Sequence, residues 1–304
     1  MIDNTPNAPM VLGTRGSMLA RTQTESVAEL LRALDIDVTV RIFETRGDRD
    51  QSAPVPELGG KGLFTAELEA ALLAGDIDAA VHSLKDLPTD DTPGLKVGAV
   101  LRREDPRDAL VTRGSKKLAD LPAGARVGTA SRRRAALLLA VRPDLVVVPV
   151  RGNIDTRVGR VEGGDLDGVV LAAAGLKRIA RTDAISELLS FLPAPAQGAL
   201  AVQARTDRGD VLENLSRLHD PATFACTSAE RALLHSLEGG CSVPVGALAE
   251  PVGAELWLRG LVASLDGKRV LEAEARHDDP WILGEQVAAK LREQGAQEIL
   301  DALS

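Results

Sequence analysis

The sequence predicts an α/β protein with two doubly wound lobes, followed by a small C-terminal α+β domain with an antiparallel sheet. Short apolar runs alternate with amphipathic helical stretches from Met10 to about Leu101, and a second alternation begins near Asp108. After His219, strand-like segments follow one another with only short turns between them, as in antiparallel sheets. At 304 residues the chain is also too long for one ordinary core, so we expect two or three domains.

The first lobe is expected to contain four strands and two helices. The strands are Val11–Gly13, Val38–Phe43, Ala79–His82 and Leu95–Leu101. The helices are Ser17–Leu34 and Phe64–Leu73. Between them lies Thr45–Lys61, which is rich in Gly, Pro and charge and is interpreted as a lid or binding loop.

The second lobe and the C-terminal domain follow by the same reasoning. The second lobe has expected strands Ala109–Thr112, Arg126–Gly128, Leu145–Val150 and Gly168–Ala172, with helices near Arg133–Val141 and Ile154–Glu162. A further strand, Ala199–Ala204, follows a Pro-rich breaker, and the crossing chain suggests a cleft closed by a hinge. The C-terminal domain has helices Pro221–Leu237 and Trp281–Glu293 and strands Val245–Ala249, Glu255–Ala263 and Lys268–Ala275.

The composition argues against some classes of binding partner and favours others. The net charge of −8 argues against nucleic acid or an anionic membrane, and no apolar run approaches the roughly 20 residues of a membrane span. The polar first ten residues predict no secretory signal, and two cysteines fit a reducing cytoplasm. The chain has 28 Arg against 8 Lys, a bias that suits capture of a small polyanion but also follows from GC-rich coding.

Three consecutive arginines, Arg132, Arg133 and Arg134, stand where a helix is expected to begin, with Thr129 or Ser131 as its N-cap. The helix dipole already places positive charge at that end, so cations there are unfavourable unless an anion joins them. The segment is therefore either an anion-binding site or a solvated basic patch, and the local sequence leaves both interpretations open.

Other charged residues follow predicted strands directly. Lys85 and Asp86 come after Ala79–His82, at the strand end where open α/β sheets bind ligands, although a surface salt bridge is the alternative. Arg15 and Ser17 stand at the start of the first helix without the spacing of a dinucleotide motif, and Arg151 follows another strand. Strand ends in both lobes thus deliver cations, with Arg157 in the first turns of the helix that follows.

The two cysteines have different surroundings. Cys241 sits in a Gly-Gly-Cys turn, where flanking glycines allow close approach to a ligand, whereas Cys226 lies on an apolar helix face and is expected to be inert core. No second Cys or His lies at zinc-ligand spacing, so no metal site is expected.

Eight motifs occur in a fixed order across nearly the whole chain. They are Thr14-Arg-Gly-Ser, Gly59-Gly-Lys-Gly-Leu-Phe, Val81-His-Ser-Leu-Lys-Asp-Leu-Pro, Arg103-Glu-Asp-Pro-Arg-Asp-Ala, Arg151-Gly-Asn, Ala173-Ala-Gly-Leu-Lys-Arg, Gln197-Gly-Ala and Leu237-Glu-Gly-Gly-Cys. By these motifs the sequence resembles the porphobilinogen deaminase, or hydroxymethylbilane synthase, family. The resemblance implies two lobes like those of periplasmic solute-binding proteins and a third domain that carries a cysteine on a loop.

The resemblance also implies a reaction. Members of the family attach a dipyrromethane cofactor through a thioether to a cysteine, which Cys241 matches. They then add four porphobilinogen units with loss of ammonia and release hydroxymethylbilane by hydrolysis, a step toward tetrapyrroles, porphyrins and heme. The resemblance also suggests a monomer whose partner is the small-molecule substrate porphobilinogen.

The family's functional residues carry over to matching positions. Asp86 matches the catalytic aspartate, which stabilises the electron-poor azafulvene left by ammonia and transfers protons. The implied cofactor-binding residues are Lys85, Asp86, Thr129, Ser131, Arg133, Arg134, Arg151, Gly152 and Cys241. The implied substrate-binding residues are Arg15, Ser17, Phe64, Arg151, Arg157, Arg178 and Gln197, with Lys61 on the mobile active-site loop.

Three departures from the family pattern qualify the resemblance. Arg132 stands where leucine is usual and is expected at the surface, because neighbours on a helix point about 100° apart. Met18 replaces a proline, and Glu57 replaces a lysine of some members. The expected domains are 1–102 with 199–217, then 103–198, then 218–304. The alternative function is a non-catalytic two-lobed binding module for a small anion, which would need neither Asp86 nor Cys241.

Overall fold

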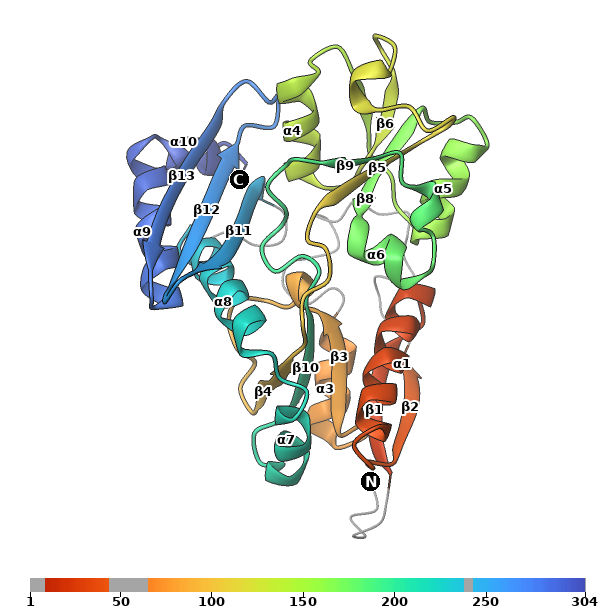
Figure 1. The fold of residues 1–304 in the computed structure, drawn as a ribbon, viewed down its shortest axis with the longest axis vertical. Coiled ribbons are helices and arrows are strands. Elements are labelled where there is room, and N and C mark those ends of the chain that lie inside the picture. The colour runs from red at the N-terminus through yellow and green to blue at the C-terminus, as the bar shows by residue number, and fades with distance from the viewer. Residues whose placement is uncertain (1–8, 44–64, 238–242, 304) are drawn as a thin grey trace. The chain divides into compact units, whose positions relative to one another are not determined.

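The computed structural model describes residues 9–43, 65–237 and 243–303, which Figure 1 draws as a coloured ribbon. The chain divides into two compact units. Unit 1 comprises Met1–Arg103 and Ala199–Phe224, and unit 2 comprises Glu104–Gly198 and Ala225–Ser304. The sequence predicts that 218–304 form a separate third domain. The division into two units does not test this, so it stays a prediction.

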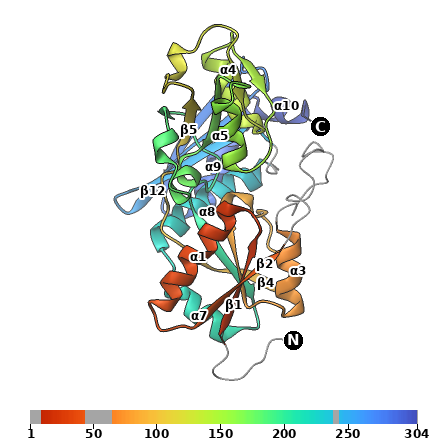
Figure 2. The same ribbon diagram turned by 90° about the vertical axis from the view of Figure 1, so that its right-hand side faces the viewer.

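Unit 1 is built on a five-stranded sheet in the order β2-β1-β3-β10-β4. Its elements are β1 (Met10–Arg15), α1 (Met18–Arg32), β2 (Val38–Phe43), α3 (Ala66–Ala74), β3 (Ala79–Ser83), the 3-10 helix η1 (Leu84–Asp86), β4 (Leu95–Val100), β10 (Leu200–Arg205) and α7 (Gly209–Ser216). Val27 and Leu31 of α1 pack into one core cluster of the sheet, and Leu68 and Leu72 of α3 pack into another. Figure 2 shows α1 and α3 on opposite faces.

Unit 2 contains a second five-stranded sheet, in the order β7-β6-β8-β5-β9. Its elements are β5 (Asp108–Thr112), η2 (Leu118–Asp120), β6 (Arg126–Gly128), α4 (Arg132–Val141), β7 (Val146–Val148), α5 (Ile154–Glu162), β8 (Gly168–Ala172), α6 (Ala173–Arg178), η3 (Thr182–Ala184) and β9 (Glu187–Leu189). Val158 of α5 and Leu176 of α6 belong to one core cluster, whereas Leu138 of α4 belongs to a separate one. The sheet is therefore enclosed by helices, as expected for a doubly wound lobe.

Unit 2 also contains a three-stranded antiparallel sheet in the order β11-β12-β13. Its elements are the part of α8 (Pro221–Ser236) from Ala225 onward, β11 (Val245–Val252), β12 (Glu255–Ala263), β13 (Val270–His277), α9 (Pro280–Glu293) and α10 (Ala296–Asp301). Ala136 and Leu137 of α4 form a core cluster with Leu261 and Ala263 of β12. Gly267, in the β12–β13 turn, has a φ of 71°, and a Cβ there would lie 2.5 Å from the Ala140 backbone nitrogen. Glycine at this position thus lets the turn approach the α4 backbone.

The fold class predicted from the sequence is confirmed, with one refinement of strand direction. Within the first sheet, β1 is parallel to β2 and β3, but β10 is antiparallel to both of its neighbours. Within the second, β6 is parallel to β7 and β8, but β5 is antiparallel to both of its neighbours. A strand buried on both faces is a continuous apolar run in either direction, so the sequence does not reveal the reversal.

Most element boundaries agree with the sequence to within two residues. The strands Val38–Phe43, Arg126–Gly128, Gly168–Ala172 and Glu255–Ala263 and the helix Ile154–Glu162 match fully. The sequence missed α6, α7, α10 and β9, each of which is only three to eight residues long. Such short segments span too few turns to establish a clear period. The predicted loop Thr45–Lys61 lies outside the described residues. No helix among the residues described is long and apolar enough to cross a membrane.

Candidate active site

The first turn of α4 is organised by two hydroxyl groups. The Ser131 Oγ accepts the Arg134 N–H at 3.4 Å, as expected of an N-cap, and the Thr129 Oγ1 accepts the Ser131 N–H at 3.1 Å. Both hydroxyls therefore stabilise the turn that links β6 to α4. This turn sets the position of the arginines that follow.

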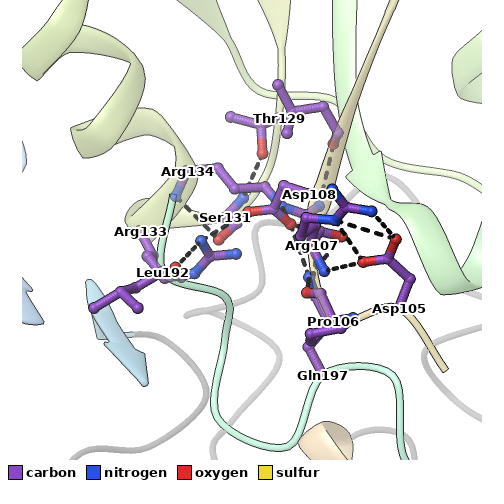
Figure 3. Close-up of polar contacts among 11 residues, drawn as sticks. Asp105, Pro106, Arg107, Asp108, Thr129, Ser131, Arg133, Arg134, Leu192 and Gln197 are labelled. Carbon is purple, nitrogen blue, oxygen red and sulfur yellow. Dashed lines mark hydrogen bonds and ion pairs between the residues drawn. The ribbon is translucent and has the colours of Figure 1, made fainter. Parts of the chain in front are cut away.

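Arg133 and Arg134 converge on one buried carboxylate, that of Asp108 at the start of β5 (Figure 3). The Arg133 Nη1 lies 2.8 Å from Asp108 Oδ2, and the Arg134 Nη2 lies 2.7 Å from Asp108 Oδ1. The side chains are 3%, 8% and 0% exposed for Arg133, Arg134 and Asp108, so the cluster is essentially dry. The anion needed at this helix N-terminus is thus supplied in part by the protein itself. Asp108 was not among the site residues predicted from the sequence.

Further hydrogen bonds fix both guanidiniums. Arg134 donates from Nε to Asp108 at 2.9 Å, from Nη1 to the Val170 carbonyl at 3.1 Å and from Nη2 to the Gln197 Oε1 at 3.2 Å. Gln197 in turn donates from Nε2 to Asp108 Oδ1 at 2.9 Å. Arg133 donates from Nη1 to the Leu192 carbonyl at 2.7 Å, but its buried Nε has no hydrogen-bond partner among the described residues.

The charges in this cluster are strongly coupled. Burial alone would raise the pKa of Asp108, but the two guanidiniums and the Gln197 hydrogen bond outweigh it and hold that pKa well below its usual range. Burial also lowers the pKa of Arg133, an effect that Asp108 opposes. Two guanidiniums and one carboxylate leave one net positive charge. A buried unpartnered donor beside a net positive charge favours an additional anionic ligand.

Arg151 supplies a second unsatisfied donor in unit 2. It follows β7 and is half-buried, and its Nη2 is buried without a hydrogen-bond partner among the residues that the structure describes. The next residue, Gly152, has a φ of 103°, and its carbonyl accepts a hydrogen bond from Arg157 Nε at 2.8 Å. Asn153 caps α5 by accepting the Thr156 N–H at 2.8 Å. The turn after β7 therefore orders two of the predicted anion ligands.

Arg178 ends α6, the helix that follows β8. Its Nη2 donates to the Gly198 carbonyl at 2.7 Å, and burial lowers its pKa against the opposing effect of Glu104. Strands β7, β6 and β8 are parallel neighbours, so the segments that follow them leave the same edge of the sheet. The sequence-predicted cations of unit 2 are thus delivered at one sheet edge.

Unit 1 presents a comparable edge, where the parallel strands β1 and β3 end. Ser17 follows β1 and caps α1 by accepting the Ala20 N–H at 3.3 Å, and Arg15 is the last residue of β1. Lys85 and Asp86 form η1 directly after β3, and both are half-buried. The Asp86 carboxylate has no hydrogen-bond or ion-pair partner within the described part of the chain. It is therefore available to a ligand.

Three polar residues of unit 1 were not predicted. Gln23 of α1 donates from Nε2 to the Ser83 Oγ at 3.1 Å, which ties α1 to the residue before η1. His82, also on β3, is buried, and burial followed by the charge of Arg15 lowers its pKa from 6.5 to about 4. A neutral His82 therefore adds no positive charge beneath Arg15 at neutral pH. Gln23 and His82 stand on mostly apolar faces, which is the signal that the sequence offers.

Several predicted residues lie outside the described residues: Lys61, Phe64, Glu57 and Cys241. Cys226, by contrast, is buried in α8 within the core of the antiparallel sheet. Within the described part of the chain, no three His, Cys, Asp or Glu side chains are grouped to hold a metal ion.

Two family models match the chain. "Porphobilinogen deaminase, dipyromethane cofactor binding domain" matches residues 10–213, and "Porphobilinogen deaminase, C-terminal domain" matches residues 224–293. The chain belongs to the porphobilinogen deaminase family. The family membership predicted from the sequence motifs is thereby confirmed.

Curated relatives match over nearly their whole length. Porphobilinogen deaminase of Syntrophomonas wolfei is 47% identical over 296 residues, which cover 95% of this chain and 97% of that protein. The enzyme of Geobacillus kaustophilus is 47% identical over 298 residues, with 96% of both chains covered. That of Nocardia farcinica is 48% identical over 306 residues, with 96% and 88% covered.

Solved structures are matched at lower similarity. The methionine-binding protein MetQ has a TM-score of 0.46 and 12% identity, with 73% of this chain and 94% of that chain covered. The VFT2 domain of Bordetella pertussis BvgS has a TM-score of 0.43 and 19% identity, with 69% and 86% covered.

Proposed function

We propose that the protein joins four porphobilinogen units head to tail, with loss of one ammonia per unit, and releases hydroxymethylbilane by hydrolysis. The reaction proceeds on a dipyrromethane primer bound through a thioether to Cys241. Family membership supports this activity, because relatives named porphobilinogen deaminase match along nearly the whole chain. Within the molecule, the observation that carries the proposal is the set of buried, unsatisfied guanidinium donors at a sheet edge of unit 2.

The residues present fit a polyanionic cofactor. Each pyrrole ring of the primer and of the growing chain carries two carboxylates, so binding requires several fixed cations. The Arg133 Nε and the Arg151 Nη2 are buried donors without partners among the described residues. A charge-assisted hydrogen bond contributes about 1.5–3 kcal/mol, and a few of them would retain the cofactor through repeated turnovers. Lys85, Asp86, Thr129, Ser131, Arg134 and Gly152 complete the proposed cofactor-binding set.

The primer supplies a nucleophilic pyrrole carbon when it is bound, and the chain supplies charge and orientation. Among the described residues Asp86 has no hydrogen-bond or ion-pair partner, so its carboxylate can accept pyrrole N–H groups, stabilise positive charge that develops as ammonia departs, and transfer a proton. Arg15 and Ser17 bind substrate carboxylates in unit 1. Arg157, Arg178 and Gln197 do so in unit 2, and Phe64 and Lys61, which precede α3 in the sequence, are also assigned to the active site by the family resemblance.

The cellular setting is also part of the proposal. Two cysteines in 304 residues, one of them a buried core residue, fit a reducing cytoplasm. A monomer is proposed as well, and size-exclusion chromatography with light scattering should give a mass near 32.0 kDa. A stable dimer would contradict that part of the proposal alone.

Intact-protein mass spectrometry tests the proposed function. Protein purified from cells that make porphobilinogen should exceed its sequence mass by two pyrrole units. Incubation with porphobilinogen should then add further units as a ladder. Cys241→Ser should lack the adduct. The matched control Cys226→Ser should keep it, because Cys226 is buried in the hydrophobic core between α8 and the antiparallel sheet. A wild-type protein at its bare sequence mass would contradict the proposal.

A further inference from the structure

Glu230, in the middle of α8, is a buried carboxylate that the proposed reaction does not use. Its side chain is 0% exposed, and its two oxygens accept hydrogen bonds from backbone N–H groups of two different segments. The Oε2 accepts from Ala196 at 2.6 Å, and the Oε1 accepts from Ala249 of β11 at 2.9 Å. A charge is rarely placed in a dry interior without such compensation, so the arrangement is specific.

The segment held by Glu230 has an unusual backbone. Ala196 has a φ of 62°, a left-handed conformation that is sterically disfavoured for a residue with a Cβ. Gly198 has a φ of 95°, and a Cβ there would lie 2.4 Å from the Glu104 carbonyl oxygen. Two left-handed residues thus flank Gln197. The Ala196 N–H would otherwise be a buried donor in a strained turn, so Glu230 stabilises this conformation directly.

The same turn holds two of the predicted anion ligands. Gln197 bridges Arg134 and Asp108 through its carboxamide, and the Gly198 carbonyl accepts from Arg178. The path from the α8 carboxylate to the guanidiniums is therefore continuous. It runs from Glu230 to the Ala196 N–H, along the backbone to Gln197 and Gly198, and from there to Arg134 and Arg178 (Figure 3 shows its last part, around Gln197).

We propose that Glu230 is a positioning residue of the anion site. By accepting the Ala196 N–H, it fixes the turn that presents the Gln197 carboxamide to Arg134 and the Gly198 carbonyl to Arg178. Glu230 lies on α8, and Cys241 follows that helix in the sequence, outside the described residues. The inference rests on the proposed function for the identity of the ligand.

The substitution Glu230→Gln tests the proposal with little change of volume. A carboxylate presents two acceptor oxygens, whereas a carboxamide presents one, so one of the two backbone N–H groups must face an NH₂ group. The matched control is Asp78→Asn in unit 1. Asp78 is also buried and accepts a backbone N–H, that of Val11 at 2.8 Å, while pairing with Arg208. Both variants should unfold at lower temperature than the wild type.

Only Glu230→Gln should change ligand handling. We expect the Michaelis constant for porphobilinogen to rise about tenfold, equivalent to about 1.4 kcal/mol of binding. The fraction of protein that carries the cofactor, read from intact mass, should also fall. Asp78→Asn should match the wild type in both measurements. Wild-type values for Glu230→Gln, or equal changes in the two variants, would overturn the proposal.

A double-mutant cycle with Gln197→Ala separates positioning from simple loss of stability. If Glu230 acts through Gln197, the two substitutions share one effect on the Michaelis constant, and the double variant resembles Gln197→Ala alone. Multiplied effects would show that Glu230 acts elsewhere and would contradict the proposal. Glu230→Asp, which keeps both acceptor oxygens but has a shorter reach, enters the same cycle if Glu230→Gln yields no folded protein.

The outcomes also separate this inference from the proposed function. A wild-type protein without an adduct removes the proposed function, whatever the variants do. A loaded, active wild type with a Glu230→Gln variant that behaves like Asp78→Asn removes only the role of Glu230.

Discussion

The two units differ in whether the charged side chains that follow their strands are paired with other protein groups. In unit 2, Arg133 and Arg134 are buried against Asp108, and Gln197 joins the cluster. In unit 1, Asp86 is half-buried and has no partner among the described residues. A cluster that is already paired is rigid before the ligand arrives, whereas an unpaired carboxylate remains reactive. In the proposed function, the paired arginines of unit 2 are ligands of the polyanion, and Asp86 of unit 1 takes part in the reaction.

This contrast has an energetic consequence. Removing a partner from a buried ion cluster leaves uncompensated charge in the interior, so the loss falls on stability. Removing an unpaired, half-buried group costs the fold little, so the loss falls on activity alone. Substitutions at the two sites should therefore separate cleanly into two classes.

The largest effect is expected at Asp86. The variant Asp86→Asn keeps the shape of the side chain but removes the charge that, in the proposed function, stabilises the developing cation and transfers protons. Turnover should fall by about 10²–10⁴-fold, as is typical for loss of a general acid–base group. The melting temperature should remain that of the wild type. Tetrapyrrole release at the normal rate, followed by absorbance after oxidation to porphyrin, would remove Asp86 from the mechanism.

The next largest effect is expected at Asp108, and it should appear as stability. Asp108→Asn leaves two buried guanidiniums without a counter-charge, which should lower the free energy of unfolding by about 3–5 kcal/mol. Urea denaturation measures this quantity. Asp105→Asn is the control, because Asp105 pairs with the more exposed Arg107 and its loss should have a small effect. Equal stability of the two variants would show that the buried cluster is not a structural element.

An intermediate effect is expected from His82 when the pH is lowered. Its pKa is about 4 in the folded protein against 6.5 for the free side chain, so the unfolded chain binds a proton that the folded chain does not. Stability should therefore fall as the pH decreases from 6.5 to about 4, by up to about 3 kcal/mol, and this contribution should not change further below pH 4. The comparison is urea denaturation of wild type and His82→Gln across that range. A stability difference between them that stays constant with pH would contradict the assignment.

Much of this contrast could be anticipated from the sequence. Alternating periods located the strands and helices, and charged residues directly after apolar strands identified both edges, including Arg15, Asp86 and Arg151. Motif order supplied the family. The sequence showed unfavourable positive charge at Arg132–Arg134. It could not show that Asp108 supplies the compensating negative charge, because Asp108 is more than twenty residues away in the chain, beside a different strand.

What the sequence could not supply are pairings between distant segments. Gln23 meets Ser83, and Glu230 meets Ala196, only because helices dock on particular strands and turns. In the sequence, a polar residue on an apolar helix face that binds a ligand cannot be distinguished from one that hydrogen-bonds to the backbone of another segment. Strand direction was hidden for a similar reason, because β5 and β10 are apolar runs that give no sign of their antiparallel pairing.

The smallest effect is expected at Arg132, and it tests the contrast within a single helix turn. Arg132 is partly exposed, whereas the next residue, Arg133, is buried and carries an unpartnered Nε. Arg132→Ala should change the free energy of unfolding by no more than about 0.5 kcal/mol and leave cofactor occupancy unchanged. Arg133→Lys keeps the positive charge but loses the planar fork that reaches both Asp108 and a ligand, so occupancy should fall. If Arg132→Ala lowers occupancy as much as Arg133→Lys, the triplet acts through its total charge, and burial would no longer distinguish the arginines that hold the cofactor.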